Sequence, residues 1–224
     1  MTNRAEQFVP PDNLALEQTR IPAARCQKGC PMKRLCVYCG SRPGSQPDYT
    51  EAAENLARAL VRRKIEVVYG GASVGTMGVL ANTVLAEGGH VIGIIPQSVV
   101  DREVVHRGLS DLRVVTSMHE RKALMAELSD GFIALPGGLG TLDEVFEILT
   151  WGQLGLHQKP CGLLNIRDYY RGLIDFLDHA VAERFITDVH RAMLLVEKEP
   201  ERLLEHFERY QAPAVAKSVD RTSA

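Results

Sequence analysis

Hydrophobic residues in the middle of the chain gather in seven short runs that show almost no polar alternation. Runs of this kind, rich in Val, Ile and Leu, are typical of parallel strands that are covered on both faces. The predicted strands are Arg34–Tyr38, Ile65–Tyr69, His90–Ile95, Leu112–Val115, Gly131–Leu135, Cys161–Leu164 and Met193–Val196.

Segments with the helical spacing of apolar residues separate these runs. The predicted helices are Tyr49–Arg63, Gly75–Glu87, Met118–Leu128, Leu142–Leu154, Tyr169–Glu183 and Glu201–Tyr210. Strands and helices in alternation favour right-handed crossovers. The sequence therefore predicts an α/β fold, a single-domain, doubly wound, Rossmann-like parallel sheet with helices on both faces. In such folds the ligand site lies beyond the carboxyl ends of the strands.

The two ends of the chain lack this periodicity. Residues 1–32 are polar and contain proline, and residues 213–224 are also polar. We predict a loosely ordered extension at 1–32, one folded domain at 33–212 and a tail at 213–224.

Composition narrows the class of protein. The chain has 224 residues, of which 45% are hydrophobic and 24% charged, and its formal charge is 26 − 28 = −2. A chain of this length can bury a full core without disulfides, and its near-neutral charge argues against a nucleic-acid partner. No run approaches the ~20 apolar residues of a membrane span, and the N-terminal segment lacks an apolar signal region. We predict a soluble protein of the cytoplasm.

The spacing of the cysteines gives only weak support for a metal site. Cys26, Cys30, Cys36 and Cys39 read C-x3-C-x5-C-x2-C, and Cys161 stands alone. This spacing fits no familiar zinc module, and a redox pair is disfavoured because it ends a strand instead of opening a helix. We predict no metal site, and expect the strand cysteines to be small buried hydrophobes.

Three predicted strands are followed by glycine-rich loops, Cys39–Gly44, Gly70–Gly78 and Pro136–Glu144. Glycine lets the backbone approach a ligand closely, and amides at a helix N-terminus suit a phosphate. Each loop alone could be an ordinary tight turn. Neither G-x-x-x-x-G-K-[ST] nor a clear ribose-binding acid is present, which disfavours a kinase, an ATPase or an ordinary NAD enzyme.

Two segments match capping boxes. Ser117-x-x-Glu120 makes Glu120 a structural residue, and Thr141-x-x-Glu144 could be explained in the same way or as part of a phosphate site. Arg121 and Lys122 then fall in the first turn of a helix, where the macrodipole disfavours cations. We expect an anion to offset them, either a ligand phosphate or a carboxylate such as Glu144. The alternative is a solvated charge pair.

Four segments together resemble signatures of the Lonely Guy family, whose members are cytokinin riboside 5′-monophosphate phosphoribohydrolases. The segments are Tyr69–Gly78, Met118–Lys122, Pro136–Glu144 and Trp151–Pro160. The resemblance runs from about Arg34 to Tyr210 and leaves residues 1–32 outside. Ala72 stands where many members have a third glycine.

The resemblance implies hydrolysis of the N-glycosidic bond of a nucleoside 5′-monophosphate, with no metal or organic cofactor. It makes Arg121 and Glu144 the catalytic pair. Together with the glycine loops, it makes the candidate substrate-binding residues Gly40, Ser41, Gly71, Glu103, Met118, Lys122, Gly137, Gly138, Leu139, Gly140, Thr141, Asp143 and Thr150. Glu144 would stabilise positive charge on the sugar and activate water, while loop amides hold the phosphate.

Two other functions stay open at this point. A nucleotide or molybdenum-cofactor carrier on the same fold would keep the glycine loops but would not need Arg121 and Glu144. A pyridoxal-dependent decarboxylase, the family's older label, would need a Schiff-base lysine pocket that no segment indicates.

The predicted helix from Leu142 is apolar around nearly its whole circumference, at Val145, Phe146, Ile148, Leu149, Trp151 and Leu154. Such a helix is either central in the subunit or covered by a partner. Because the resemblance also implies a dimer with its site near the interface, we predict a homodimer.

Overall fold

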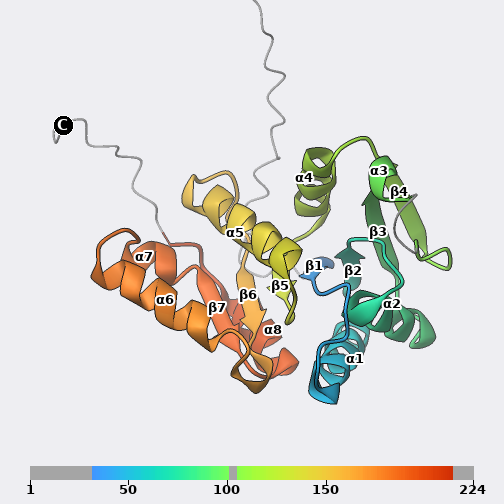
Figure 1. Ribbon diagram of the computed structural model, residues 1–224, viewed down its shortest axis with the longest axis horizontal. Coiled ribbons are helices and arrows are strands. Elements are labelled where there is room, and N and C mark those ends of the chain that lie inside the picture. The colour runs from blue at the N-terminus through green and yellow to red at the C-terminus, as the bar shows by residue number, and fades with distance from the viewer. Residues whose placement is uncertain (1–31, 101–104, 214–224) are drawn as a thin grey trace, which may run out of the picture.

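The computed structural model describes residues 32–100 and 105–213, and these build one sheet of seven parallel strands (Figure 1). The strand order is β4-β3-β2-β1-β5-β6-β7, which confirms the predicted α/β class. The strands are β1 (Arg34–Tyr38), β2 (Glu66–Tyr69), β3 (Val91–Pro96), β4 (Asp111–Val115), β5 (Gly131–Ala134), β6 (Cys161–Leu164) and β7 (Leu194–Glu197).

Helices cover both faces of the sheet. They are α1 (Pro47–Arg62), α2 (Gly75–Ala86), α3 (Gln97–Val100), α4 (Met118–Leu128), α5 (Leu139–Gln153), α6 (Arg171–Ala182), α7 (Asp188–Arg191) and α8 (Pro200–Arg209), with a 3-10 turn η1 (Ile166–Asp168). In the view of Figure 1, α4 and α5 lie above the sheet and α1 and α8 below it. The strands β1, β2, β3, β5 and β6 therefore bury side chains on both faces, as their apolar runs indicate, whereas the edge strand β4 leaves Leu112 and Val114 partly exposed.

Alternation along β1 shows how the two core layers form. Leu35 and Val37 pack with α1 and α2, whereas Cys36 and Tyr38 pack with α4 and α5, and all four are buried. Successive side chains of a strand point to opposite faces. Since β1 lies between β2 and β5, the chain winds outward from β1 in both directions. The carboxyl ends of β1 and β5 form the switch point where such folds bind ligands.

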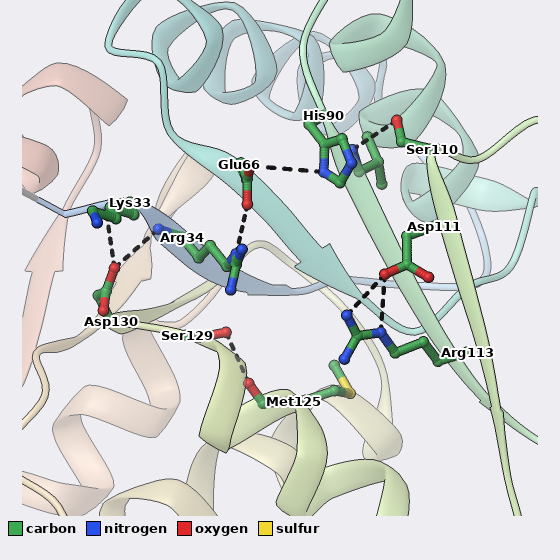
Figure 2. Close-up of polar contacts among 11 residues, drawn as sticks. Lys33, Arg34, Glu66, His90, Ser110, Asp111, Arg113, Met125, Ser129 and Asp130 are labelled. Carbon is green, nitrogen blue, oxygen red and sulfur yellow. Dashed lines mark hydrogen bonds and ion pairs between the residues drawn. The ribbon is translucent and has the colours of Figure 1, made fainter. Parts of the chain in front are cut away.

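The amino ends of the strands are held by polar contacts far from that point (Figure 2). Asp130 accepts hydrogen bonds from the backbone amides of Lys33 at 2.7 Å and Arg34 at 3.0 Å. The Arg34 side chain pairs with Glu66 at 2.5 Å. These contacts join the starts of β1, β2 and β5, and because the ion pair is half-exposed it adds little stability.

Predicted boundaries agree with the structure at β1, β6 and α4 and differ by one or two residues at most other elements. The short α3, α7 and η1 were not predicted. The predicted start of α5 at Leu142 is wrong, because the helix begins at Leu139. Glycines next to this position have low helix propensity, which concealed the first turn.

The cysteines of the described residues are Cys36, Cys39 and Cys161, and all three are buried free thiols. Burial raises the pKa of Cys39 and of Cys161 to about 12, as expected of small buried hydrophobes. Cys26 and Cys30 lie outside the described residues, as do the predicted extension up to residue 31 and the tail from 214. None of the helices in the described ranges has the length and hydropathy needed to span a bilayer.

Candidate active site

A cavity of about 310 Å³ opens at the switch point, between the carboxyl ends of the central strands and the starts of α4 and α5. We call it the reaction cavity. It is lined by Val37, Cys39, Gly40, Ser41, Gly70, Met77, Ile95, Pro96, Val99, Met118, Arg121, Gly138, Leu139, Gly140, Thr141 and Glu144. All three predicted glycine loops therefore reach one space.

Arg121 and Glu144 form an ion pair in this cavity. Arg121 Nη1 lies 3.0 Å from Glu144 Oε1, and both side chains are largely buried. Arg121 Nε donates to the Ile94 carbonyl at 3.0 Å, and Nη1 also contacts Met118 Sδ at 3.3 Å. These contacts hold the guanidinium from β3 and from its own helix, so it presents a fixed geometry to Glu144.

Glu144 is only 8% exposed. Burial raises the pKa of its carboxyl, the charge of Arg121 opposes that shift, and the charge of Asp143 adds to it, leaving the pKa above its ordinary value of 4.5. The result is a carboxylate more basic than one in water. Such a group suits both proton transfer and stabilisation of nearby positive charge.

The absence of a side chain at residue 70 leaves room for the observed position of the Arg121 guanidinium. A Cβ at Gly70 would lie 2.2 Å from Arg121 Nη2 and 2.7 Å from Met77 Cε. The sequence placed Gly70 in a glycine-rich loop but did not indicate that this glycine makes room for Arg121.

The loop after β1 is fastened to the start of α2. Thr76, 1% exposed, accepts from the Gly40 amide and donates to the Gly40 carbonyl, each at 3.0 Å. Gly75 has φ +59, and a Cβ there would lie 2.3 Å from the carbonyl carbon of Ser41. Thr76 was not predicted as a site residue, yet it positions the loop that carries Gly40 and Ser41.

The start of α5 corrects one of the two capping-box interpretations. Gly138 is the N-cap and makes no side-chain cap. Thr141 and Glu144 lie inside the helix, three positions apart, and both line the reaction cavity. A Cβ added at Gly138 or Gly140 would meet nothing within 4 Å, so the backbone of the first turn faces open space. Orphan amides of this turn are available to a ligand.

The other capping box is confirmed. Ser117 Oγ accepts from the Glu120 amide at 3.1 Å, and Glu120 accepts from the Thr116 amide at 2.7 Å and the Thr116 hydroxyl at 2.6 Å. The hydrogen bond from the Thr116 hydroxyl, helped by the one from its amide, lowers the pKa of Glu120. Glu120 is therefore structural, as predicted.

Lys122 is not among the residues that line the reaction cavity. Its Nζ lies 3.2 Å from Asp143 and 3.0 Å from Glu147, both on α5. Burial lowers the pKa of Lys122, but hydrogen bonds with Glu147 and Asp143 raise it more. The two cations at the start of α4 thus meet carboxylates of α5, which is one of the two offsets that the sequence left open.

Several predicted site residues lie elsewhere. Gly71, with φ +81, is buried against β3, and its carbonyl accepts from the His106 amide at 3.0 Å. Thr150 is exposed on α5, where it donates to the Phe146 carbonyl at 2.7 Å and lines a separate hollow of about 190 Å³. Glu103 lies outside the described residues.

A second cavity of about 600 Å³ adjoins the first and shares Gly40, Ser41, Gly138 and Leu139 with it. Gly137 and Tyr169 line it, and the Tyr169 hydroxyl donates to the Gly137 carbonyl at 2.6 Å. The N-terminus of α5 therefore separates two spaces. The apolar lining residues of the reaction cavity that sequence reasoning missed are Val37, Cys39, Met77, Ile95, Pro96 and Val99.

A family model and several known proteins are similar to this chain in sequence. The sequence model of a family described as "Possible lysine decarboxylase" matches residues 77–207. A cytokinin riboside 5′-monophosphate phosphoribohydrolase of Rhodococcoides fascians is 53% identical over 170 residues, which cover 75% of this chain and 86% of the relative. The enzyme of the same name, LOG7, from Arabidopsis thaliana is 46% identical over 179 residues, covering 80% of this chain and 82% of the relative.

Among solved structures, the molybdenum cofactor binding protein of Rippkaea orientalis superposes with a TM-score of 0.59 at 24% identity. That match covers 79% of this chain and 96% of the other. The molybdenum cofactor carrier protein of Chlamydomonas reinhardtii gives a TM-score of 0.58 at 18% identity, covering 77% of this chain and 98% of the other. At these identities the likeness shows the fold alone.

Proposed function

Because the chain belongs to the family of cytokinin riboside 5′-monophosphate phosphoribohydrolases, we propose that it hydrolyses the N-glycosidic bond of nucleoside 5′-monophosphates. The substrates are AMP, N6-modified AMP or both, and the products are the free base and ribose 5-phosphate. One observation carries the proposal, the Arg121–Glu144 pair at 3.0 Å in a cavity that the open first turn of α5 also lines.

The 5′-phosphate fits the start of α5. Backbone amides of Gly138, Leu139 and Gly140 belong to the first helical turn, where the macrodipole favours an anion. The Thr141 hydroxyl lines the same cavity. Lys122 does not line this cavity, because its ammonium group is paired with Asp143 and Glu147.

Glu144 then faces the sugar. The bond between C1′ and the base nitrogen breaks with its electron pair leaving on the base, and positive charge grows on the ribose. The Glu144 carboxylate stabilises this charge and takes a proton from the water whose oxygen bonds to C1′. The departing nitrogen takes up one proton, so the net change is the addition of one water.

Arg121 keeps Glu144 ionised and aimed at the substrate. Its charge opposes the rise in pKa that burial imposes, and its contacts with Ile94 and Met118 prevent it from following a mobile partner. Apolar residues beyond the pair, Ile95, Pro96 and Val99, supply a surface for the base.

The same pair argues against the two other functions. A carrier needs the glycine loops but gains nothing from a buried carboxylate with a raised pKa. A pyridoxal-dependent decarboxylase needs a Schiff-base lysine, and the described residues that line the reaction cavity include none.

We extend the proposal to a homodimer and a cytoplasmic location. Thr150, which the family resemblance makes a nucleotide-binding residue, lies on the outer side of α5 and does not line the reaction cavity of its own chain. It would reach a nucleotide only in the cavity of a second copy. Free buried thiols at Cys36, Cys39 and Cys161 support a reducing compartment.

The test is incubation with AMP and with N6-isopentenyl-AMP, followed by chromatography of the free base and assay of ribose 5-phosphate. We expect equimolar base and sugar phosphate, and a rate reduced at least ~100-fold in Glu144→Gln and in Arg121→Ala, as for loss of a positioned catalytic group.

Glu120→Gln is the matched control, since it removes a neighbouring charge from a residue that caps α4, and glutamine also caps helices. It should retain the wild-type rate. Full activity in Glu144→Gln would contradict the assigned roles, and no base release by the wild-type protein would contradict the function.

A further inference from the structure

A lysine and a histidine are buried in the connection from α5 to β6, away from the reaction cavity. Lys159 is 7% exposed and His157 is 6% exposed. Neither lines the reaction cavity, so the mechanism above does not use them. Burying an ammonium group is costly unless its donors are satisfied, so this arrangement needs a physical reason.

Lys159 reaches across to α4. Its Nζ donates to the carbonyl of Ala126, in the last turn of that helix, at 2.8 Å. A cation at a helix carboxyl end is favoured by the macrodipole. Burial lowers the pKa of Lys159, and the charges of Asp130 and Glu127 partly restore it, although neither forms an ion pair with it within the described residues. The backbone carbonyl of α4 is therefore its main partner.

His157 fastens the same connection to α5. Its Nε2 lies 2.8 Å from the Ile148 carbonyl and donates to it, because Nδ1 accepts from the Lys159 amide at 3.1 Å. The ring packs against Phe132 of β5 with centroids 5.4 Å apart. A Cβ at Gly152 would lie 3.3 Å from His157 Cε1, so that glycine leaves room for the ring.

These contacts join two helices that also meet at the active site. Ala126 follows Arg121 on α4, and Ile148 follows Glu144 on α5, each by about one turn. The same two helices are joined by the ion pairs Arg121–Glu144 and Lys122–Glu147, each at 3.0 Å, and Glu147 directly precedes Ile148 on α5. The Lys159–His157 link is therefore attached about one turn beyond Lys122 on α4 and directly beside Glu147 on α5, next to the ion pairs that join the same helices.

We propose that Lys159 and His157 are positioning residues, which hold α4 and α5 in the relative position that keeps Arg121 on Glu144. The inference rests on the proposed function only in taking Glu144 as the catalytic carboxylate.

Lys159→Met tests it, because methionine keeps the length and burial of the side chain and removes its donor. We expect kcat for base release to fall about tenfold, with KM changed less than about twofold, because small displacements of catalytic groups are costly. Since Arg121 lowers the pKa of Glu144, loosening the pair should raise that pKa. The main charges that act on the pKa of Glu144 are those of Arg121, Asp143 and Lys122, so a shift as large as that of Arg121→Gln would report a change in the pair.

NMR titration of the Glu144 carboxyl carbon measures the pKa of Glu144, and so the state of the Arg121–Glu144 pair, without any turnover. The measurement is therefore informative even if AMP is not a substrate. His157→Gln keeps an N–H near the Ile148 carbonyl, so its kcat for base release should fall less than that of His157→Leu. Lys198→Met, at an exposed lysine paired with Asp168, should match wild type.

A Lys159→Met protein that melts at a lower temperature, yet keeps wild-type kcat and wild-type Glu144 titration, would overturn the proposal and leave the link purely structural. If that variant does not fold, His157→Gln decides by the same two measurements.

Discussion

At the scale of single residues, the site depends on a carboxylate that is costly to bury. Desolvation and the neighbouring Asp143 favour its neutral form, and Arg121 favours the ionised form. A guanidinium group, which can form two parallel hydrogen bonds with a carboxylate, stabilises the ionised form of Glu144 better than an ammonium group would. The second cation, Lys122, forms ion pairs with Asp143 and Glu147. The ion pair with Asp143 partly offsets the repulsion between Asp143 and Glu144.

The pH profile follows from this balance. Glu144 works ionised, and its pKa in the folded protein lies above 4.5, so kcat/KM should rise with pH through a limb centred above 4.5. In Arg121→Gln the interaction that lowers the pKa is lost, so the limb of the residual activity should move to higher pH. Rates of base release measured from pH 4 to pH 8 check both points. A limb at or below 4.5, or one that Arg121→Gln does not move, would assign the titration to another group.

At the scale of elements, the decisive feature is where α5 begins. Its first turn contains Leu139, Gly140 and Thr141 and lines the reaction cavity, and the first amides of a helix have no partner within the helix. Glycine in a helix costs about 1 kcal/mol relative to alanine. The chain therefore keeps a locally unfavourable residue at the point where a phosphate would need close approach.

The variant Gly140→Ala separates the effect of this glycine on stability from its effect on phosphate binding. Apart from its chain neighbours and the backbone of its own helix, no atom lies within 4 Å of the added Cβ, so the free energy of unfolding should rise by up to about 1 kcal/mol. Because the methyl group occupies the space facing the cavity, KM for AMP should rise at least about tenfold. Chemical denaturation and steady-state kinetics give the two values.

The matched control is Gly172→Ala in α6, where an added Cβ also meets nothing within 4 Å. It should gain similar stability and keep the wild-type KM. Unchanged KM in Gly140→Ala would move the phosphate away from the first turn of α5.

The order of elements could be predicted because the central strands β1, β2, β3, β5 and β6 are buried on both faces and therefore appear as apolar runs. The start of α5 could not, since Gly138 caps it with backbone alone and its first turn resembles a loop in sequence. For the site, the charge conflict at Arg121 and Lys122 indicated a nearby anion, either a ligand phosphate or a carboxylate such as Glu144, but did not indicate that Lys122 pairs with Asp143 and Glu147. Those pairings depend on how α4 and α5 lie in space. The role of Gly70 likewise depends on the position of the Arg121 guanidinium beside it, just after the end of β2.

At the scale of the whole molecule, α5 bears on assembly. Val145 and Ile148 are buried against the sheet, whereas Phe146 is 37% exposed and Leu154 is 68% exposed. The predicted apolar circumference is thus half covered within the subunit. Thr150, carried on the exposed side, lies beside Phe146 in the separate hollow. We call the exposed side with Phe146, Thr150 and Leu154 the outer face of α5.

The proposed dimer uses this outer face. Light scattering should give about twice the chain mass of 24.7 kDa at micromolar concentration. Phe146→Asp should give a monomer with reduced activity, because a desolvated charge opposes association. Val114→Lys, a change at a half-exposed residue of the edge strand β4, should remain a dimer. A wild-type monomer would contradict the assembly.

Mixed dimers test whether the outer face completes the neighbouring site. When Glu144→Gln subunits are combined with Thr150→Ala subunits, one cavity has no catalytic carboxylate. The other keeps Glu144 and, if Thr150 acts across the interface, receives an intact Thr150 from its partner. Activity should therefore rise above that of either variant alone, toward half of the wild-type rate per dimer. If Thr150 acted within its own chain, no cavity of the mixed dimer would have both residues, and mixing would give no gain.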